Sequence, residues 1–447
     1  MAVNTTVYCS EAIEENRFSA EYFDPKYSFK PKNGSKWIKI GQALKKCQYG
    51  ISISMNENGD GHPIFRMNEI KDCFVTEASK YAQISKKDFN DLSLQVNDVL
   101  FNRTNSFEFV GRTGIVKKDT DSVFASYLIR IIPNSEILLP EYLTIYLNTK
   151  FGIGQIKRRA MPSINQANVS GSELKRIKIL VPDMSAQKKV AELVDQSFSQ
   201  KEYSLTHYEE AQKILEQELG LDKLKFEKPV GYETSFNEII GAARMDAQCY
   251  KPDYVTYEKF LKQNSNYSFL KGLTSSVVKG KQMIAVSSGQ VPYVSIKDID
   301  GIELVADSYC FPTKETQIAK KGDLLLAITG ATIGKIGIVT QYDRLAFSGD
   351  LLKLETYNDI NSYYLLTVMQ SQIGQSQCNR WTTGSTNGHL APKDVGKIVI
   401  PRIGEKKEEQ IAEKITDSLR LKKESKQFLE KAKQMVEDLI EQAAGGT

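Results

Sequence analysis

The sequence is poor in the residues that build catalytic and metal centres. Its 447 residues include only six cysteines and three histidines; no two cysteines form a C-x-x-C pair, and the histidines lie far apart. A zinc site, a disulfide framework or a Ser/His/Asp or Cys/His catalytic set is therefore not expected. Unpaired thiols of this kind suit a reducing cytoplasm.

Long apolar runs and a cationic, apolar leader are also lacking, which predicts a soluble cytoplasmic protein with no membrane partner. Lys and Arg number 59 against 55 Asp and Glu, so the formal charge of +4 does not by itself indicate nucleic-acid binding. The chain has no Pro-Pro, which excludes the [DNS]-P-P-[YF] turn of an adenine methyltransferase. In the segment Gly330 to Ile336, which is similar to a phosphate loop, the glycines are one position too close and Ile336 replaces the magnesium-binding Ser or Thr. We therefore predict no cofactor and no enzyme activity in this chain.

What the sequence does have is a repeat. The segment from Arg17 to Tyr27 follows the pattern R-x-x-A-x-x-aromatic-x-P-x-Y, and the pattern returns 227 positions later, from Arg244 to Tyr254. Further matching blocks follow in the same order along the chain, among them the blocks that begin at Asp98 and Asp323. Two long copies of one unit predict two similar domains, each with its own core.

The sequence pattern of each copy is typical of a mixed α+β domain followed by a long helix. Short β-rich runs at 96–101 and 176–181 predict strands, and residues 140–150 predict a helix that starts at Pro140. Residues 183–219 contain no Gly or Pro and carry a narrow apolar stripe, as do residues 405–442 apart from interruptions such as Ser418 and Ser425.

The fold class we predict is α+β, with two similar mixed α/β domains joined by two long helices that form an antiparallel coiled coil with pseudo-two-fold symmetry. An alternative is two separate solvated helices, each docked on its own domain. The predicted boundaries are 1–182 for the first domain, 183–220 for the first long helix, 221–402 for the second domain and 403–447 for the second long helix.

Basic and amide side chains lie beside aromatic residues on predicted loops in both copies, which is the composition expected for contacts with phosphates and base edges. Corresponding positions stay polar but change identity, which predicts that the two copies read different short sequences. The candidate DNA-binding residues are Tyr49, Arg66, Asn68, Arg103, Asn105, Ser106, Arg112, Lys157, Arg158, Arg159 and Asn165 in the first copy, and Lys279, Lys281, Ser295, Lys297, Thr329, Thr332, Lys335, Arg380, Trp381, Ser385 and Asn387 in the second.

The chain resembles the DNA specificity subunit of type I restriction-modification systems. The resemblance is carried by residues 98–106 and 111–116, by their relatives 322–326 and 334–339, and by the strands ending at Pro182 and Pro401 that lead into the long helices. It implies a non-catalytic subunit that recognises a split, asymmetric site on double-stranded DNA. In that case residues 1–182 and 221–402 are the two target-recognition domains, and residues 183–220 and 403–447 are the spacer helices. The implied partners are two modification subunits that carry S-adenosylmethionine, and restriction or motor subunits.

Two alternatives remain open from the sequence. One is a scaffold or adaptor whose long helices bind proteins and whose DNA contact is incidental. The other is the specificity subunit of a related two-gene restriction enzyme that cuts on both sides of its site.

Overall fold

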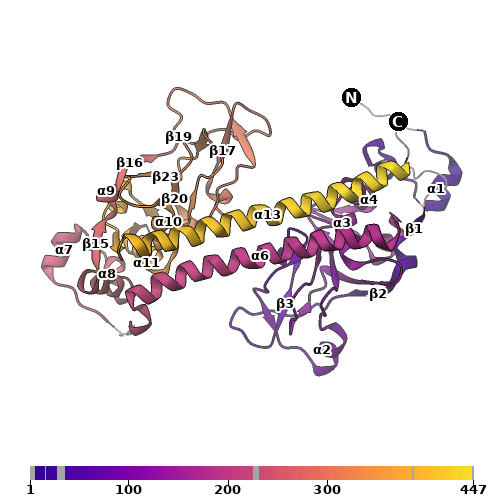
Figure 1. Cartoon of the computed structure of the whole chain (residues 1–447), viewed down its shortest axis with the longest axis horizontal. Helices are drawn as coiled ribbons and strands as arrows, with labels where there is room; N and C mark the ends of the chain where they lie inside the picture. Colours follow the sequence, from indigo (N-terminus) through magenta and orange to yellow (C-terminus); the bar gives the residue numbers. More distant parts are fainter. Residues whose placement is uncertain (1–5, 16, 28–35, 225–230, 385–386, 445–447) are drawn as a thin grey trace. The chain divides into compact units, whose positions relative to one another are not determined.

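The computed structural model describes residues 6–15, 17–27, 36–224, 231–384 and 387–444 (Figure 1). It divides into two compact units, residues 1–201 with 422–447 and residues 202–421. Each unit therefore combines one αβ body with parts of both long helices, α6 (Met184–Leu219) and α13 (Glu405–Ala444). Both long helices were predicted, and Gly220 ends α6 in a left-handed conformation with φ of +65°.

The first unit is built around a six-stranded sheet of order β2-β11-β7-β9-β5-β4, beside a three-stranded sheet β10-β3-β6. The strands are β1 (Trp37–Lys39), β2 (Leu44–Tyr49), β3 (His62–Phe65), β4 (Ile70–Lys71), β5 (Phe74–Val75), β6 (Tyr81–Ala82), β7 (Val99–Asn102), β8 (Thr104–Asn105), β9 (Thr113–Ile115), β10 (Val123–Phe124), β11 (Leu128–Pro133), β12 (Met161–Ser163), β13 (Gln166–Asn168) and β14 (Lys178–Leu180). The helices are α1 (Cys9–Glu15), α2 (Lys86–Leu92), α3 (Pro140–Leu147), α4 (Lys150–Arg159) and α5 (Gly171–Arg176).

The second unit repeats this plan with a four-stranded sheet β16-β23-β20-β21 and a second sheet β18-β17-β22-β19. Its strands are β15 (Asn266–Phe269), β16 (Thr274–Lys279), β17 (Val291–Val294), β18 (Ser308–Cys310), β19 (Ile318–Ala319), β20 (Leu324–Ala327), β21 (Ile336–Ile338), β22 (Leu345–Phe347), β23 (Leu351–Thr356), β24 (Thr382–Thr383), β25 (His389–Leu390) and β26 (Val399–Arg402). Its helices are α7 (Phe236–Ala242), α8 (Pro252–Asn264), α9 (Leu270–Leu273), α10 (Ser362–Gln370), α11 (Gln372–Trp381) and α12 (Pro392–Val395).

The two units share a common set of paired strands, although the six-stranded sheet of the first unit has four strands in the second. The pair β1 and β14 has its equivalent in β15 and β26, and the parallel pair β3 and β10 has its equivalent in β17 and β22. The structure is thus mixed α/β in both units, and the sequence repeat reflects a repeated fold.

In each unit a helical hairpin lies between the sheet and the long helices. In the first unit, Tyr142 and Tyr146 of α3 share one apolar core with Val190 of α6 and Val436 of α13. In the second unit, α10 and α11 share a core with the end of α6 and the start of α13. The stripes on the long helices are therefore buried within their own units, against the domain bodies as well as against each other.

Two details of the predicted stripes were wrong. Leu205, which we expected in the buried apolar stripe of α6, is 47% exposed, and the buried residue beside it is Ser204. The serines of α13, which interrupt its apolar stripe in the sequence, are also buried, because each bonds a serine of α6. Ser197 Oγ donates to the Ser425 carbonyl at 2.9 Å in the first unit, and Ser204 Oγ donates to the Ser418 carbonyl at 2.7 Å in the second.

The shorter predicted elements are present with shifted ends. The helix predicted for 140–150 stops at Leu147, because the Thr149 side chain caps a new helix, α4, by accepting from the Gly152 amide at 3.2 Å. The strand predicted for 96–101 begins at Val99, and the one for 176–181 begins at Lys178, after α5 ends at Arg176. Within the described ranges, no helix combines the length and the apolar character needed to cross a membrane.

Candidate nucleic-acid interface

The repeated sequence pattern holds the same internal contacts in both units. Arg158 Nε donates to the Tyr22 carbonyl at 3.1 Å, and at the matching place Arg380 Nε donates to the Cys249 carbonyl at 3.0 Å. The aromatic and Pro positions of the pattern thus sit against the second helix of each hairpin. The repeated pattern therefore maintains internal contacts of the fold.

A buried glutamine and a buried tyrosine extend this common framework. Gln155 bonds both backbone groups of Lys178, and Gln377 bonds both backbone groups of Val399, with all four distances between 2.7 and 2.9 Å. Each pair clamps a helix to the strand that leads into a long helix. The hydroxyl of Tyr364 adds a 2.7 Å bond to the Pro401 carbonyl.

In the first unit, Tyr49 and Arg103 lie together at the ends of β2 and β7. The Arg103 guanidinium stands 5.0 Å from the centre of the Tyr49 ring, and its Nη1 donates to the Ser126 carbonyl at 3.3 Å. The Tyr49 hydroxyl accepts from the Gly171 amide at 2.6 Å. The side chain is nevertheless 45% exposed, so its ring face is available for stacking.

Arg66 and Asn68 line a neighbouring hollow of about 380 Å³, together with Ser126 and Tyr127. Arg66 is held in place by Glu69 at 3.0 Å and by the Ser79 hydroxyl at 2.8 Å. Asn68, in the short turn that follows, is exposed. Because Ser126 also accepts from Arg103, the structure gathers Tyr49, Arg66, Asn68 and Arg103 around one surface depression.

A second group of candidates surrounds the loop between β8 and β9. The Asn105 side chain accepts from the Ser106 amide at 2.8 Å, and the Arg112 guanidinium lies 4.0 Å from the centre of the Phe109 ring. The Lys157 ammonium donates to the carbonyl oxygens of residues 107, 108 and 110. Burial lowers the pKa of Lys157 to about 8. Lys157 therefore holds this loop in place through three of its backbone carbonyls.

Asn165 lies at the tip of the hairpin β12–β13, with φ of +58°. The hairpin joins the loop because β13 pairs with β8. Ile164 beside it is 91% exposed. The hairpin therefore presents its tip to solvent.

The second unit presents its candidates on equivalent elements. Lys279 ends β16 as Tyr49 ends β2, and each is followed by a glycine that the fold requires: a Cβ on Gly50 would lie 2.3 Å from the Ala125 carbonyl oxygen, and one on Gly280 would lie 2.2 Å from that of Ser348. Lys281 is ion-paired with Glu315.

Ser295 and Lys297 occupy the turn that matches Arg66 and Asn68. In both turns a carboxylate accepts from the amide three residues earlier, Glu69 from Arg66 at 2.8 Å and Asp298 from Ser295 at 2.7 Å. Lys297 is exposed, as is Asn68. The two copies therefore offer different side chains from one backbone geometry.

The remaining candidates of the second unit lie near the hairpin β24–β25. The Thr329 hydroxyl donates to Asp350 at 2.9 Å, the Thr332 hydroxyl donates to the Thr329 carbonyl at 3.1 Å, and Lys335 and Asn387 are exposed. Ser385 lies outside the described residues.

Four of the residues predicted to contact DNA lie in the second helix of each hairpin and are buried or half-buried, and the three arginines among them have internal partners. Arg159 is 2% exposed and pairs with Glu15 at 3.0 Å and with Glu173 at 3.3 Å. Arg380 is 7% exposed and pairs with Glu258, and Trp381 is 4% exposed. Arg158 is half-buried, with its guanidinium 4.0 Å from the Tyr22 ring centre. Residue type and spacing gave no signal that these cations face carboxylates from distant segments.

Two residues of the first hollow were missed from the sequence, Ser126 and Tyr127, the latter 42% exposed. Their signal was present, since the matching second-copy residues are Gly349 and Asp350 and the two blocks differ there. Among the described residues, no three potential metal-ligating side chains cluster.

Comparison with known proteins shows what this chain is similar to. Residues 31–214 match the type I restriction modification DNA specificity domain. The chain is 23% identical over 409 residues to a Methanocaldococcus jannaschii protein named as a type I restriction enzyme MjaX specificity subunit, covering 89% of this chain and 90% of that one. It is 28% identical over 181 residues to the type I restriction enzyme EcoKI specificity subunit of Escherichia coli, which is 40% of this chain but only 38% of the relative.

Among solved structures, the type I restriction-modification S subunit from M. genitalium is 13% identical, with 94% of this chain and 99% of that chain covered and a TM-score of 0.43. These matches show that the chain is similar to proteins named as specificity subunits of type I restriction-modification systems.

Proposed function

We propose that this chain is the specificity subunit of a type I restriction-modification complex and recognises a bipartite, asymmetric DNA target, with one unit for each half-site. The observation that carries the proposal is the pair of equivalent turns in which Arg66 and Asn68 in one unit are replaced by Ser295 and Lys297 in the other, on the same hydrogen-bonded backbone. A common frame with different exposed side chains is what two readers of unlike sequences require.

The chemistry of the exposed side chains supports a division of roles. An amide such as Asn68 or Asn165 can bond the N6 and N7 edge of adenine, and an arginine such as Arg112 can bond the O6 and N7 edge of guanine. Exposed lysines such as Lys279 and Lys335 suit phosphates, which set register and orientation without reading sequence. In the first unit, Tyr49 offers an aromatic face close to Arg103.

We also propose that α6 and α13 form an antiparallel coiled coil that sets the distance between half-sites, with the domain limits predicted from the sequence. Support comes from the length of α6, whose 36 residues span about 54 Å at the α-helical rise, and from the serine pairs between the two helices in each unit. In this proposal two modification subunits, which carry S-adenosylmethionine, dock around the chain in the cytoplasm, and restriction or motor subunits join them.

A matched pair of substitutions tests the half-site assignment. Methylated adenines would be mapped in cells in which the complex carries Asn68→Ala, Lys297→Ala or the control Lys314→Ala, after deletion of the gene has shown which bipartite motif depends on this chain. Asn68→Ala should relax sequence preference in one half of the motif only. Lys297→Ala should weaken binding through the other half, and the control should change neither. Effects of both variants in the same half, or unchanged preference in both, would contradict the proposal.

DNA binding by the complex separates the reader from the scaffold alternative. Binding that falls with rising salt while the sequence preference is retained supports the reader, whereas no DNA binding even beside the methyltransferase supports a scaffold.

Insertion of four residues after Gln200, with four more at the facing part of α13 after Leu421, tests the spacing role. Four residues add about 6 Å of helix. The tolerated gap between half-sites should change; methylation restricted to the original gap would refute the spacing role.

A further inference from the structure

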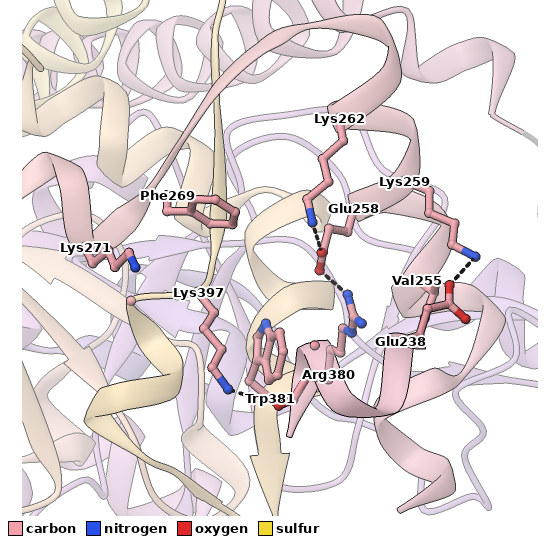
Figure 2. Close-up of a pocket in the computed structure, with 13 residues that line it drawn as sticks. Glu238, Val255, Glu258, Lys259, Lys262, Phe269, Lys271, Arg380, Trp381 and Lys397 are labelled. Carbon is pink, nitrogen blue, oxygen red and sulfur yellow. Dashed lines mark hydrogen bonds and ion pairs between the residues drawn. The ribbon is translucent and has the colours of Figure 1, made fainter. Parts of the chain in front are cut away.

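The second unit contains a pocket that the proposed DNA interface does not use. It has a volume of about 500 Å³ and lies among α7, α8, β15 and α11. Figure 2 shows its walls: Phe269 and Trp381 face the space, with Lys262 and Lys271 at its edges. Apolar walls with a few polar groups are the usual lining of a ligand site of this size.

The pocket arises where the two copies of the repeat differ. In the first unit, Arg159 fills the equivalent place and is neutralised by Glu15 and Glu173. In the second, the corresponding residues are Trp381, Ala242 and Asp394. The change removes a guanidinium and a carboxylate from the middle of the site.

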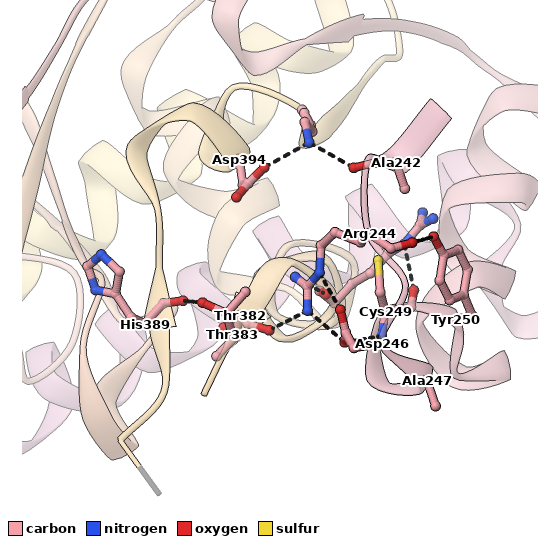
Figure 3. A network of polar contacts seen from close by, with 12 residues as sticks. Ala242, Arg244, Asp246, Ala247, Cys249, Tyr250, Thr382, Thr383, His389 and Asp394 are labelled. Atoms are coloured by element: carbon pink, nitrogen blue, oxygen red, sulfur yellow. Dashed lines mark hydrogen bonds and ion pairs between the residues drawn. The ribbon is translucent and has the colours of Figure 1, made fainter. Parts of the chain in front are cut away.

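One contact next to the pocket is the same in both units. Arg176 donates to the carbonyl of residue 15 at 2.7 Å, and Lys397 donates to the carbonyl of Ala242 at 3.1 Å. Figure 3 shows Ala242 and Asp394, two partners of Lys397. Lys397 also pairs with Asp394 at 2.8 Å. The backbone contact around the site is therefore the same in both units, while the side chains at its centre differ. The pocket of the second unit results from these side-chain differences.

Most charges around the pocket are already paired. Lys262 binds Glu258 at 2.6 Å, and Lys259 binds Glu238 at 3.0 Å. The pKa of Glu238 is lowered to about 2, first by the hydrogen bond from the Ser235 amide and then by Lys259. Both carboxylates are engaged in these ion pairs, so they do not leave the site acidic.

Two hydrogen-bond donors stay without an acceptor among the described residues. The Trp381 indole N–H is buried with none. Lys271 is exposed at the edge of the pocket, and no ion pair involves it within the described part of the chain. A buried donor without a partner is uncommon and calls for an explanation, which a bound acceptor would supply. Five cations, counting Arg380, face three carboxylates here, so that acceptor is favoured to be anionic.

We propose that this pocket binds a carboxylate carried on an apolar or aromatic body. The body packs between Phe269 and Trp381, and the carboxylate pairs with Lys271 and accepts the hydrogen bond of the Trp381 indole N–H. The carboxylate can come from an acidic, apolar segment of a protein partner or from a free small molecule, and the test separates these sources.

Tryptophan fluorescence tests the pocket directly, because the chain has only two tryptophans and Trp37→Phe leaves Trp381 as the single reporter. The probe is 3-phenylpropionate, with the neutral 3-phenylpropanamide as its matched control. We expect a saturable change in emission with the acid and at least tenfold weaker binding of the amide. Lys271→Gln should weaken the acid at least tenfold, Lys271→Arg should retain binding, and Lys314→Gln, a lysine remote in sequence, should have no effect.

Equal binding of acid and amide, no saturable change at millimolar probe, or unaltered binding by Lys271→Gln with an unchanged melting curve would each overturn the proposal. These measurements need neither DNA nor a partner, so they are independent of the half-site proposal.

The source is then found from association with the modification subunit, an arm that rests on the proposed function. If saturating probe and Lys271→Gln both weaken association, the occupant is a segment of that subunit. If association is unchanged while the probe still binds, the occupant is a free carboxylate.

Discussion

Replacing Arg130 by methionine should destabilise the first unit far more than the equivalent change, Lys353→Met, destabilises the second. Arg130 is 3% exposed and its guanidinium donates to the carbonyls of Ser93 and Asp91, both at 2.7 Å, and to Asp98 at 3.1 Å. Methionine keeps much of the apolar volume but leaves the 3% exposed Asp98 without its cation. Removing one member of a buried ion pair costs about 3–5 kcal/mol.

Lys353 makes longer contacts, 3.7 Å to Asp323 and 3.6 Å to Glu355, and its side chain is 13% exposed. Its loss leaves fewer groups unpaired, so we expect a cost of about 1–2 kcal/mol, as for loss of a single hydrogen bond to a charged group. The two substitutions occupy matching strands, β11 and β23, so fold context is held nearly constant.

The free energy of unfolding of both variants is measured by urea unfolding followed by circular dichroism. Because the two units need not unfold together, each transition is assigned to the unit whose variant shifts it. The double variant Arg130→Met with Asp98→Asn should recover part of the loss, because it removes the buried charge. A smaller cost for Arg130→Met than for Lys353→Met, or no recovery in the double variant, would refute the assignment of the cost to the stranded carboxylate.

Three further outcomes follow from the same structure. Gly50→Ala should cost about 1–3 kcal/mol in thermal unfolding, because its Cβ would lie 2.3 Å from the Ala125 carbonyl oxygen, whereas Gly231→Ala meets nothing within 4 Å and should be close to neutral. Burial raises the pKa of Asp323 above its ordinary 3.8. The folded state therefore holds that proton more tightly than the unfolded state, so the stability of the protein relative to Asp323→Asn should fall as the pH rises from the ordinary value of 3.8 to the raised pKa of the folded state. For Lys157 the folded pKa of about 8 lies below its ordinary 10.5, so the unfolded state binds the proton more tightly and stability relative to Lys157→Met should rise with pH between those values, measured from melting curves.

The framework was predictable because the repeat exposes it. The long helices, the end of α6 at Gly220 and the correspondence of Gln155 with Gln377 can all be read from spacing and from the order of matching blocks. Helix periodicity depends on local sequence, and both copies report it independently. The boundary between α3 and α4 was missed because the Thr149 cap resembles an ordinary helical residue in sequence.

The site was less predictable, because basic residues look alike whether they face solvent or a distant carboxylate. Arg159 and Arg112 are both arginines near Gly and polar residues, yet Arg159 is buried against Glu15 and Glu173 and Arg112 is exposed. The carboxylates that decide the matter lie far from Arg159 in sequence. Only the fold brings them together.

Differences between the copies carry more functional information than their similarities. Where both copies keep a contact, as with the helix-to-strand glutamines, it holds the fold and either unit loses stability without it. Where one frame carries different exposed side chains, as with Asn68 and Lys297, the fold does not require the difference, so its reason lies in what the surface meets. The same argument applies inside the protein, where Arg159 of the first copy corresponds to Trp381 of the second. Arg159 is part of a buried ion cluster, whereas Trp381 lines a pocket and its indole N–H has no acceptor among the described residues. If duplication alone shaped this chain, that pocket would have no ligand, and replacing Trp381 with phenylalanine would change the stability of the second unit but leave binding of the probe, measured by calorimetry, unchanged.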